Sequence, residues 1–117
     1  MKKVVLLCLQ PNAPFELSPP RYQLANELYE RKYEIYVFFP GRVANKEIGD
    51  KIKHWSNTTG MTNAQIRKKI KKIMPSFVIA FTYDDAIVAY CLPQMMKGVK
   101  FYYFNIEIYT AEFEYSI

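Results

Sequence analysis

The chain has 117 residues, which is the length of one domain. Half of the residues are hydrophobic and 23% are charged, and this balance excludes an intrinsically disordered protein. There are only four glycines, and no two of them have the spacing of a dinucleotide-binding or phosphate-binding glycine loop. A net charge of +5 permits nucleic acid, anionic lipid or phosphorylated partners and selects none of them.

The few cysteine and histidine residues limit the chemistry further. Cys8 and Cys91 each lie in an apolar run, which predicts buried, reduced thiols in a cytoplasmic protein. His54 is the single histidine and there is no Cys-x-x-Cys pair, so we expect no metal site and no cofactor. The apolar run Val4–Leu9 is too short for a secretory signal or a membrane span.

The first third of the chain has the pattern of a strand, a helix and a second strand. Val4–Leu9 is continuously apolar, as in a parallel strand that is covered on both faces. Pro19 has the place of a first helical residue, and we expect this helix to end near Lys32. Tyr33–Phe39 is β-branched and aromatic, which predicts the second strand. Three apolar residues at helical spacing predict the inward stripe of the helix: Leu24, Ala25 and Leu28.

The middle of the chain contains an irregular stretch and a clear helix. For residues 42–60 we expect an irregular insertion or an edge strand, with Lys51–Trp55 as the strand. Thr62 and Gln65 have the spacing of a capping box, which predicts a helix that begins at Thr62 and is ended by Pro75. Four apolar residues of this helix are expected to face inward: Ile66, Ile70, Ile73 and Met74.

The last elements continue the alternation of strands and helices. Phe77–Phe81 predicts a strand, a helix is expected from about Ala86 to Leu92, and Lys100–Asn105 predicts another strand. Strands that alternate with helices in this way form right-handed βαβ units. The sequence therefore predicts an α/β fold, a Rossmann-like three-layer sandwich with a mostly parallel, doubly wound sheet over residues 1–117.

Candidate binding residues are expected in the loops that follow the strands, because ligands of doubly wound sheets bind beyond the carboxyl ends of the strands. Five polar side chains fall in these loops: Asn12, Glu16, Arg42, Asp84 and Glu107. For Asp84 and its neighbour Asp85 the alternative role is to cap the next helix. For Glu107 the alternative is a surface position in an alternating segment. No catalytic residue can be named from the pattern.

A run of basic residues follows the capping box, and its members are Arg67, Lys68, Lys69, Lys71 and Lys72. With the isoleucines facing inward, these five charges are expected to cover the outer face of the helix. The run is then either a solvated helix face or a patch for an anionic membrane or for nucleic acid. Aromatic residues are not interleaved with these charges, so we expect no nucleic acid partner.

Several of these segments together resemble one known family. Val4–Leu9 is followed by the helix motif Arg21-x-x-Leu24-Ala25-x-x-Leu28 and by the strand Tyr33–Val37. Further along, Pro75–Ala80 is similar to a Pro-Asp-Val-Ile strand, and Lys100–Glu107 to an aromatic strand that leads to an acidic residue. In this order the segments resemble the opening of family-4 type glycosyltransferases of the GT-B fold.

The resemblance implies that the chain is the N-terminal, acceptor-side domain of such an enzyme. The full enzyme would transfer a sugar from a nucleotide-sugar donor to a glycan or lipid-linked acceptor. This chain would be inactive alone, because the C-terminal donor-binding domain is its missing partner. The five candidate residues would then lie on the acceptor side of the cleft, and the cytoplasmic enzyme would be able to contact the inner face of the membrane.

Two other classes of function remain open. One is a small flavodoxin-like or receiver-like regulatory domain, for which Asp84 and Asp85 would have to form part of an acidic pocket. Receiver domains have their acidic pair directly after the first strand, where this chain has Gln10-Pro11-Asn12. The other is a binding module that uses the basic helix on an anionic membrane or on nucleic acid.

Overall fold

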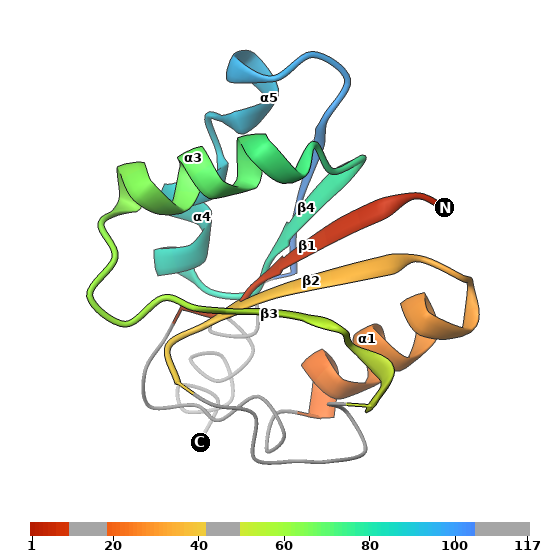
Figure 1. The fold of residues 1–117 in the computed structure, drawn as a ribbon. Helices are drawn as coiled ribbons and strands as arrows, with labels where there is room; N and C mark the ends of the chain where they lie inside the picture. The colour runs from red at the N-terminus through yellow and green to blue at the C-terminus, as the bar shows by residue number, and fades with distance from the viewer. Residues whose placement is uncertain (10–18, 42–49, 105–117) are drawn as a thin grey trace, which may run out of the picture.

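A parallel sheet forms the centre of the molecule (Figure 1). The computed structural model describes residues 1–9, 19–41 and 50–104. Within these residues the sheet has five strands in the order β3-β2-β1-β4-β5, and every neighbouring pair is parallel. The strands are β1 (Lys3–Leu7), β2 (Glu34–Phe39), β3 (His54–Asn57), β4 (Phe77–Ala80) and β5 (Lys100–Tyr103).

Helices cover both faces of the sheet (Figure 1). The helix α1 (Pro19–Glu30) lies on one face. On the other face lie α3 (Asn63–Ile73), α4 (Tyr83–Ala89) and the short α5 (Leu92–Met95). The predicted α/β, Rossmann-like, doubly wound fold is confirmed. The strand order is that of the Rossmann fold and differs from the flavodoxin order, in which the third strand of the chain lies beside the first. The topology therefore argues against the flavodoxin-like alternative.

The strand β1 is buried on both faces, which explains its continuously apolar sequence. Val4 and Leu6 pack with Ala25 on the side of α1, whereas Val5 and Leu7 pack on the side of α3. The four strand side chains are completely inaccessible to solvent. Successive side chains of a strand point to opposite faces, so a strand covered by helices on both faces needs an apolar residue at every position.

The helix α3 begins and ends as its sequence predicts. The Thr62 hydroxyl accepts the backbone N–H of Gln65 at 3.2 Å, and the Gln65 side chain accepts the backbone N–H of Thr62 at 2.8 Å. Ile66 and Ile70 are buried against the sheet as expected. For Met74 the inward placement was wrong, because this residue is the left-handed C-cap with φ +56° and its side chain is 75% exposed.

Several predicted boundaries differ from the structure by a few residues. The edge strand β3 begins at His54 rather than at Lys51, because Ile52 instead turns into the core and its carbonyl accepts the indole N–H of Trp55 at 2.8 Å. The first helix ends at Glu30, two residues before the predicted end, and Lys32 follows in the left-handed conformation. Both shifts move an element end by two or three residues and leave the order of elements unchanged.

The start of α4 was predicted three residues too late. The helix begins at Tyr83 rather than near Ala86, because Thr82 and Asp85 form a second capping box. The Thr82 hydroxyl accepts the backbone N–H of Asp85 at 3.3 Å, and the Asp85 carboxylate accepts the backbone N–H of Thr82 at 2.9 Å. Acidic side chains in the first turn also suit the positive end of the helix dipole.

Candidate functional site at the carboxyl edge of the sheet

The candidate site lies where the strand order reverses. The first strand β1 has β2 on one side and β4 on the other, and the chain leaves these two neighbours in opposite directions across the sheet. In this architecture ligands usually bind in a crevice beyond the carboxyl ends of the strands at such a point, here β1 and β4. The described residues at this place are those that directly follow the two strands, 8–9 and 81–85.

One buried carboxylate joins the two strand ends. Asp85 Oδ1 accepts the backbone N–H of Leu9, which follows β1, at 2.8 Å. Its Oδ2 accepts the backbone N–H groups of Phe81 and Thr82, which follow β4, at 3.0 and 2.9 Å. Asp85 is completely inaccessible to solvent. The three backbone donors that converge at the crevice are therefore occupied by a side chain of the protein itself.

Burial and hydrogen bonding act in opposite directions on this carboxyl group. Burial raises the pKa of Asp85, while the backbone N–H groups of Leu9, Phe81 and Thr82 and the cation of Arg21 lower it. Burial dominates, so the pKa lies above its ordinary value. The same three N–H groups explain why a carboxylate is buried here, because each of them needs a hydrogen-bond acceptor away from water.

An arginine lies underneath this edge, inside the core. Arg21 is fully buried, and its guanidinium carbon lies 5.4 Å from the centre of the Phe81 ring. Its charge lowers the pKa of both Asp85 and the Cys8 thiol, although burial raises the pKa of Cys8 far above its ordinary value. Arg21, Cys8 and Asp85 are thus buried groups that organise the edge, and none of them reaches the solvent.

Exposed side chains at the same edge are available to a ligand. Asp84 and Tyr83 lie in the first turn of α4 and are exposed. Phe104, one residue after β5, is 50% exposed, and its ring packs edge-on against Phe81 at a centroid distance of 6.2 Å. The edge therefore has an exposed carboxylate and exposed aromatic side chains, and these groups suit hydrogen-bonding ligands with an apolar face.

Of the five candidate residues from the sequence, the structure places Asp84. It lies at the carboxyl edge as expected, while its neighbour Asp85 has the alternative role of helix capping. The other four candidates lie outside the described residues: Asn12, Glu16, Arg42 and Glu107. The complete burial of Arg21 and of Asp85 was not predicted. The Thr82-x-x-Asp85 spacing, which is that of a capping box, could have indicated the role of Asp85. No sequence pattern indicated the burial of Arg21, because arginine side chains are rarely buried.

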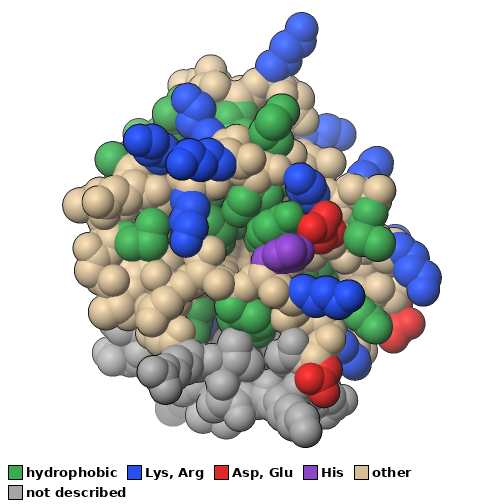
Figure 2. Space-filling model, viewed as in Figure 1, with side chains coloured by type: hydrophobic (Ala, Val, Ile, Leu, Met, Phe, Trp, Pro, Cys, Tyr) green, Lys and Arg blue, Asp and Glu red, His purple; other side chains and the backbone are tan. Residues whose placement is uncertain are grey.

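The basic run lies on the outer face of α3, as Figure 2 shows by the group of Lys and Arg side chains over this helix. Lys68, Lys69, Lys71 and Lys72 are exposed. Arg67 differs from the expectation, since it is half-buried and donates to the backbone carbonyls of Val88 at 2.9 Å and Ile87 at 3.3 Å. Four charges are therefore presented to the solvent, and the fifth holds α3 against α4.

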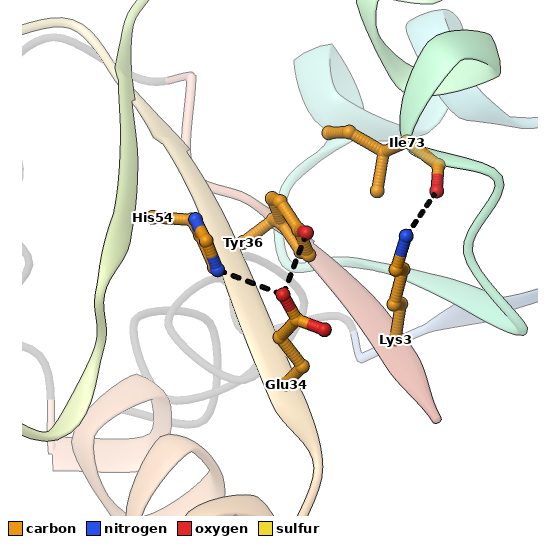
Figure 3. A network of polar contacts seen from close by, with 5 residues as sticks. All are labelled: Lys3, Glu34, Tyr36, His54 and Ile73. Carbon is orange, nitrogen blue, oxygen red and sulfur yellow. Dashed lines mark hydrogen bonds and ion pairs between the residues drawn. The ribbon is translucent and has the colours of Figure 1, made fainter. Parts of the chain in front are cut away.

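A second polar cluster lies on β2 and β3 (Figure 3). Glu34 Oε1 accepts the hydroxyl of Tyr36 and lies 2.8 Å from Nε2 of His54, and the rings of Tyr36 and His54 are stacked at 4.1 Å. The Tyr36 bond, followed by the contacts with His54 and Lys3, lowers the pKa of Glu34 despite partial desolvation. Because Tyr36 and His54 are register partners, the cluster fastens the edge strand to its neighbour.

Neither a metal-binding cluster nor a membrane-spanning helix is found in the described part of the chain. No group of three or more His, Cys, Asp or Glu residues there is arranged to hold a metal ion. Within the same ranges, no helix has both the length and the apolar sequence that a bilayer crossing needs. The two cysteines are free, and Cys91 is only half-buried, which corrects the expectation that both thiols are buried.

Comparison with known proteins shows similarity of fold only. No protein-family model matches the chain, and no curated protein matches it. A solved structure of glycinamide-RNase-transformylase T from Mycobacterium tuberculosis has a TM-score of 0.61 with 15% sequence identity. The alignment covers 86% of this chain and 28% of that one, so the chain corresponds to just over a quarter of the larger protein. At this identity the likeness extends to the α/β fold and not to activity.

Proposed function

We propose that this chain is the N-terminal, acceptor-side domain of a GT-B glycosyltransferase. In the full enzyme, a second domain would bind the nucleotide-sugar donor, and the sugar would pass to a glycan or lipid-linked acceptor in the cleft between the domains. The cytoplasm is the compartment that we assign to it. Asp84 is the described residue to which we assign an acceptor contact, through hydrogen bonds from sugar hydroxyls to its carboxylate.

The proposal rests mainly on one observation: three backbone N–H groups beyond the strand ends already have Asp85 as their acceptor. Domains that hold the phosphates of a nucleotide use free backbone N–H groups after the first strand and at the following helix. Here the N–H groups of Leu9, Phe81 and Thr82 all bind Asp85. These three N–H groups are not available to a phosphate, which supports an uncharged polyhydroxyl ligand that is recognised by side chains and a donor that is bound by another domain.

The helix motif behind the resemblance also has a clear structural role. Arg21, Ala25 and Leu28 form one buried stripe of α1, and Leu24 is partly buried beside them. Arg21 ends under Phe81 at the carboxyl edge. The motif thus connects the packing of α1 to the crevice, as expected if it belongs to the framework of a binding site rather than to the surface.

Ligand mapping by NMR tests the assignment. Short oligosaccharides added to the 15N-labelled chain should shift the amide resonances of Tyr83, Asp84 and Phe104, and a nucleoside diphosphate should not. Asp84→Asn should weaken the oligosaccharide shifts several-fold, because an amide is a poorer acceptor than a carboxylate. Glu30→Gln is the matched control, since it neutralises an exposed acid at the end of α1 far from the carboxyl edge.

Activity measurements provide a second test. Incubation of the chain with a panel of nucleotide sugars should give neither sugar transfer nor hydrolysis, because the donor-binding domain is missing. Measurable turnover would refute the assignment to an acceptor-side domain. Nucleotide-induced shifts at Leu9, Phe81 and Thr82, without any response to oligosaccharides, would point instead to a nucleotide-binding regulatory domain.

A further inference from the structure

The excess positive charge of the protein is confined to one part of the fold. Residues 63–100 contain seven Lys or Arg residues and two Asp residues, an excess of five that equals the net charge of the whole chain. This segment comprises α3, β4, α4, α5 and the first residue of β5. Its three helices cover the same face of the sheet (Figure 1). That face is consequently cationic, while the rest of the chain is neutral in sum.

Exposed apolar side chains accompany these charges on the neighbouring helix. Ile87 and Tyr90 are one turn apart, with α4 ending between them, and are 38% and 64% exposed. Met74, which caps α3, is 75% exposed, and Met95 in α5 is 47% exposed. Isolated exposed apolar residues are common. Four on three neighbouring elements of one face, beside a run of lysines, form an amphipathic surface.

The two kinds of side chain belong to one continuous surface. The Arg67 guanidinium of α3 bonds the carbonyls of Ile87 and Val88 in α4, so the two helices are held in direct contact. Lys71 is one turn after Arg67 on the same side of α3, and Met74 is nearly one turn further. Lys71 and Met74 thus lie on the side of α3 that contacts α4, and the other exposed lysines continue around the outer face of α3.

We propose that this basic–apolar face, formed by the four exposed lysines of α3 with Met74, Ile87, Tyr90 and Met95, docks onto an anionic phospholipid bilayer. Lysines at such a surface attract anionic headgroups, while Tyr and aliphatic side chains enter the interfacial layer. Nucleic acid fits this face less well, because Ile and Met side chains cannot donate hydrogen bonds to a phosphate backbone. Asp84, the exposed acid of α4, lies in its first turn beside the carboxyl edge, where it need not face the lipid.

Vesicle flotation tests the docking. The 117-residue chain should float with vesicles of phosphatidylcholine containing about a third phosphatidylglycerol and remain unbound with pure phosphatidylcholine, because the charge attraction is the larger contribution. Lys68→Gln/Lys72→Gln should weaken the binding about 30-fold, since each lysine near an anionic surface contributes about a fivefold factor. Binding should also fall steeply when the salt concentration is raised from about 0.05 M to about 0.5 M.

A matched control separates this face from general electrostatics. Lys2→Gln/Lys53→Gln removes the same charge from two exposed lysines outside residues 63–100 and should leave the flotation nearly unchanged. Tyr90→Ser keeps every charge and should lower binding several-fold through loss of interfacial contact. Circular dichroism verifies folding, which is expected because glutamine is a good helix former.

Three results would overturn the docking to lipid. The first is equal flotation with anionic and neutral vesicles. The second is an equal loss of binding in the two lysine double variants, which would show an effect of net charge only. The third is retardation of single-stranded RNA that depends on Lys68 and Lys72 without any vesicle binding, which would assign the face to nucleic acid. None of these measurements depends on oligosaccharide binding, so the docking and the proposed acceptor role fail separately.

Discussion

Replacement of Asp85 by alanine should be the most destabilising single change among the acidic residues that the structure describes. The carboxylate accepts three backbone N–H groups, and its bonds to Phe81 and Thr82 are buried, whereas the bond to Leu9 is partly buried. A buried donor that loses its acceptor costs about 1–3 kcal/mol. Two such donors give about 2–6 kcal/mol, and the removal of a buried charge returns part of this amount. We expect a net loss of about 3 kcal/mol for Asp85→Ala.

Urea denaturation followed by circular dichroism measures this loss as a lower transition midpoint. The matched control is Asp84→Ala, which removes the same group one residue earlier from an exposed position. That change should cost less than about 1 kcal/mol, because only a favourable interaction with the helix dipole is lost. A domain of this size has about 5–15 kcal/mol of stability, so both variants should still fold in water.

The difference between the two variants decides the role of the buried carboxylate. Amide hydrogen exchange should localise the effect, with faster exchange at Leu9, Phe81 and Thr82 in Asp85→Ala and little change in α3. If Asp85→Ala costs less than about 1 kcal/mol, or no more than Asp84→Ala, the three backbone donors have other acceptors. Asp85 would then not join the two strand ends.

Three more predictions concern titratable groups. Arg21→Met removes the cation that lowers the pKa of Asp85, so this pKa should rise further. The stability deficit of the variant should therefore grow as the pH rises through the pKa of Asp85 in the parent chain, which lies above its ordinary 3.8. A deficit that is independent of pH would contradict the coupling. Glu34→Gln should lower the urea midpoint at neutral pH. The difference from the parent chain should vanish as the pH falls through the lowered pKa of Glu34, which lies below its ordinary 4.5. A difference that persists in acid would refute the role of its charge. A thiol reagent should rapidly modify one cysteine in the folded chain and both cysteines in urea, because Cys8 is buried with a raised pKa. The rapid reaction should be lost in Cys91→Ser. Rapid modification of both thiols in the folded chain would contradict the burial of Cys8.

The sequence alone was sufficient for the architecture because the architecture depends on local patterns. A run such as Val4–Leu9, apolar at every position, has few stable environments other than a strand covered on both faces. The Thr62–Gln65 capping box and the isoleucines after it determine where α3 begins and which side it buries. These signals lie within one or two helical turns, so their meaning does not depend on distant parts of the chain.

The errors occurred where a residue's role depends on partners distant in the sequence. The capping role of Asp85 was among the alternatives, but its bond to Leu9, 76 positions earlier and just after a neighbouring strand, was not predicted. Arg67 was expected on the solvated face, but the carbonyls of α4 lie within its reach only after the helices pack. Arg21 is buried although its residue type is normally exposed. In each case the tertiary contact decides, and no periodicity in the sequence reports it.

The polar cluster at β2 and β3 and the buried Asp85 at the carboxyl edge differ in their exposure to solvent. Glu34 and His54 fasten an edge strand with side chains that remain partly exposed, so this cluster retains contact with water. At the carboxyl edge, Asp85 is instead completely buried and accepts three backbone N–H groups that follow β1 and β4. These three donors are therefore not available to a ligand, because each already has a buried acceptor. In the proposed acceptor-side domain, contacts with the acceptor would then be made by exposed side chains such as that of Asp84, and replacing them would leave the hydrogen bonds between β1 and β4 intact.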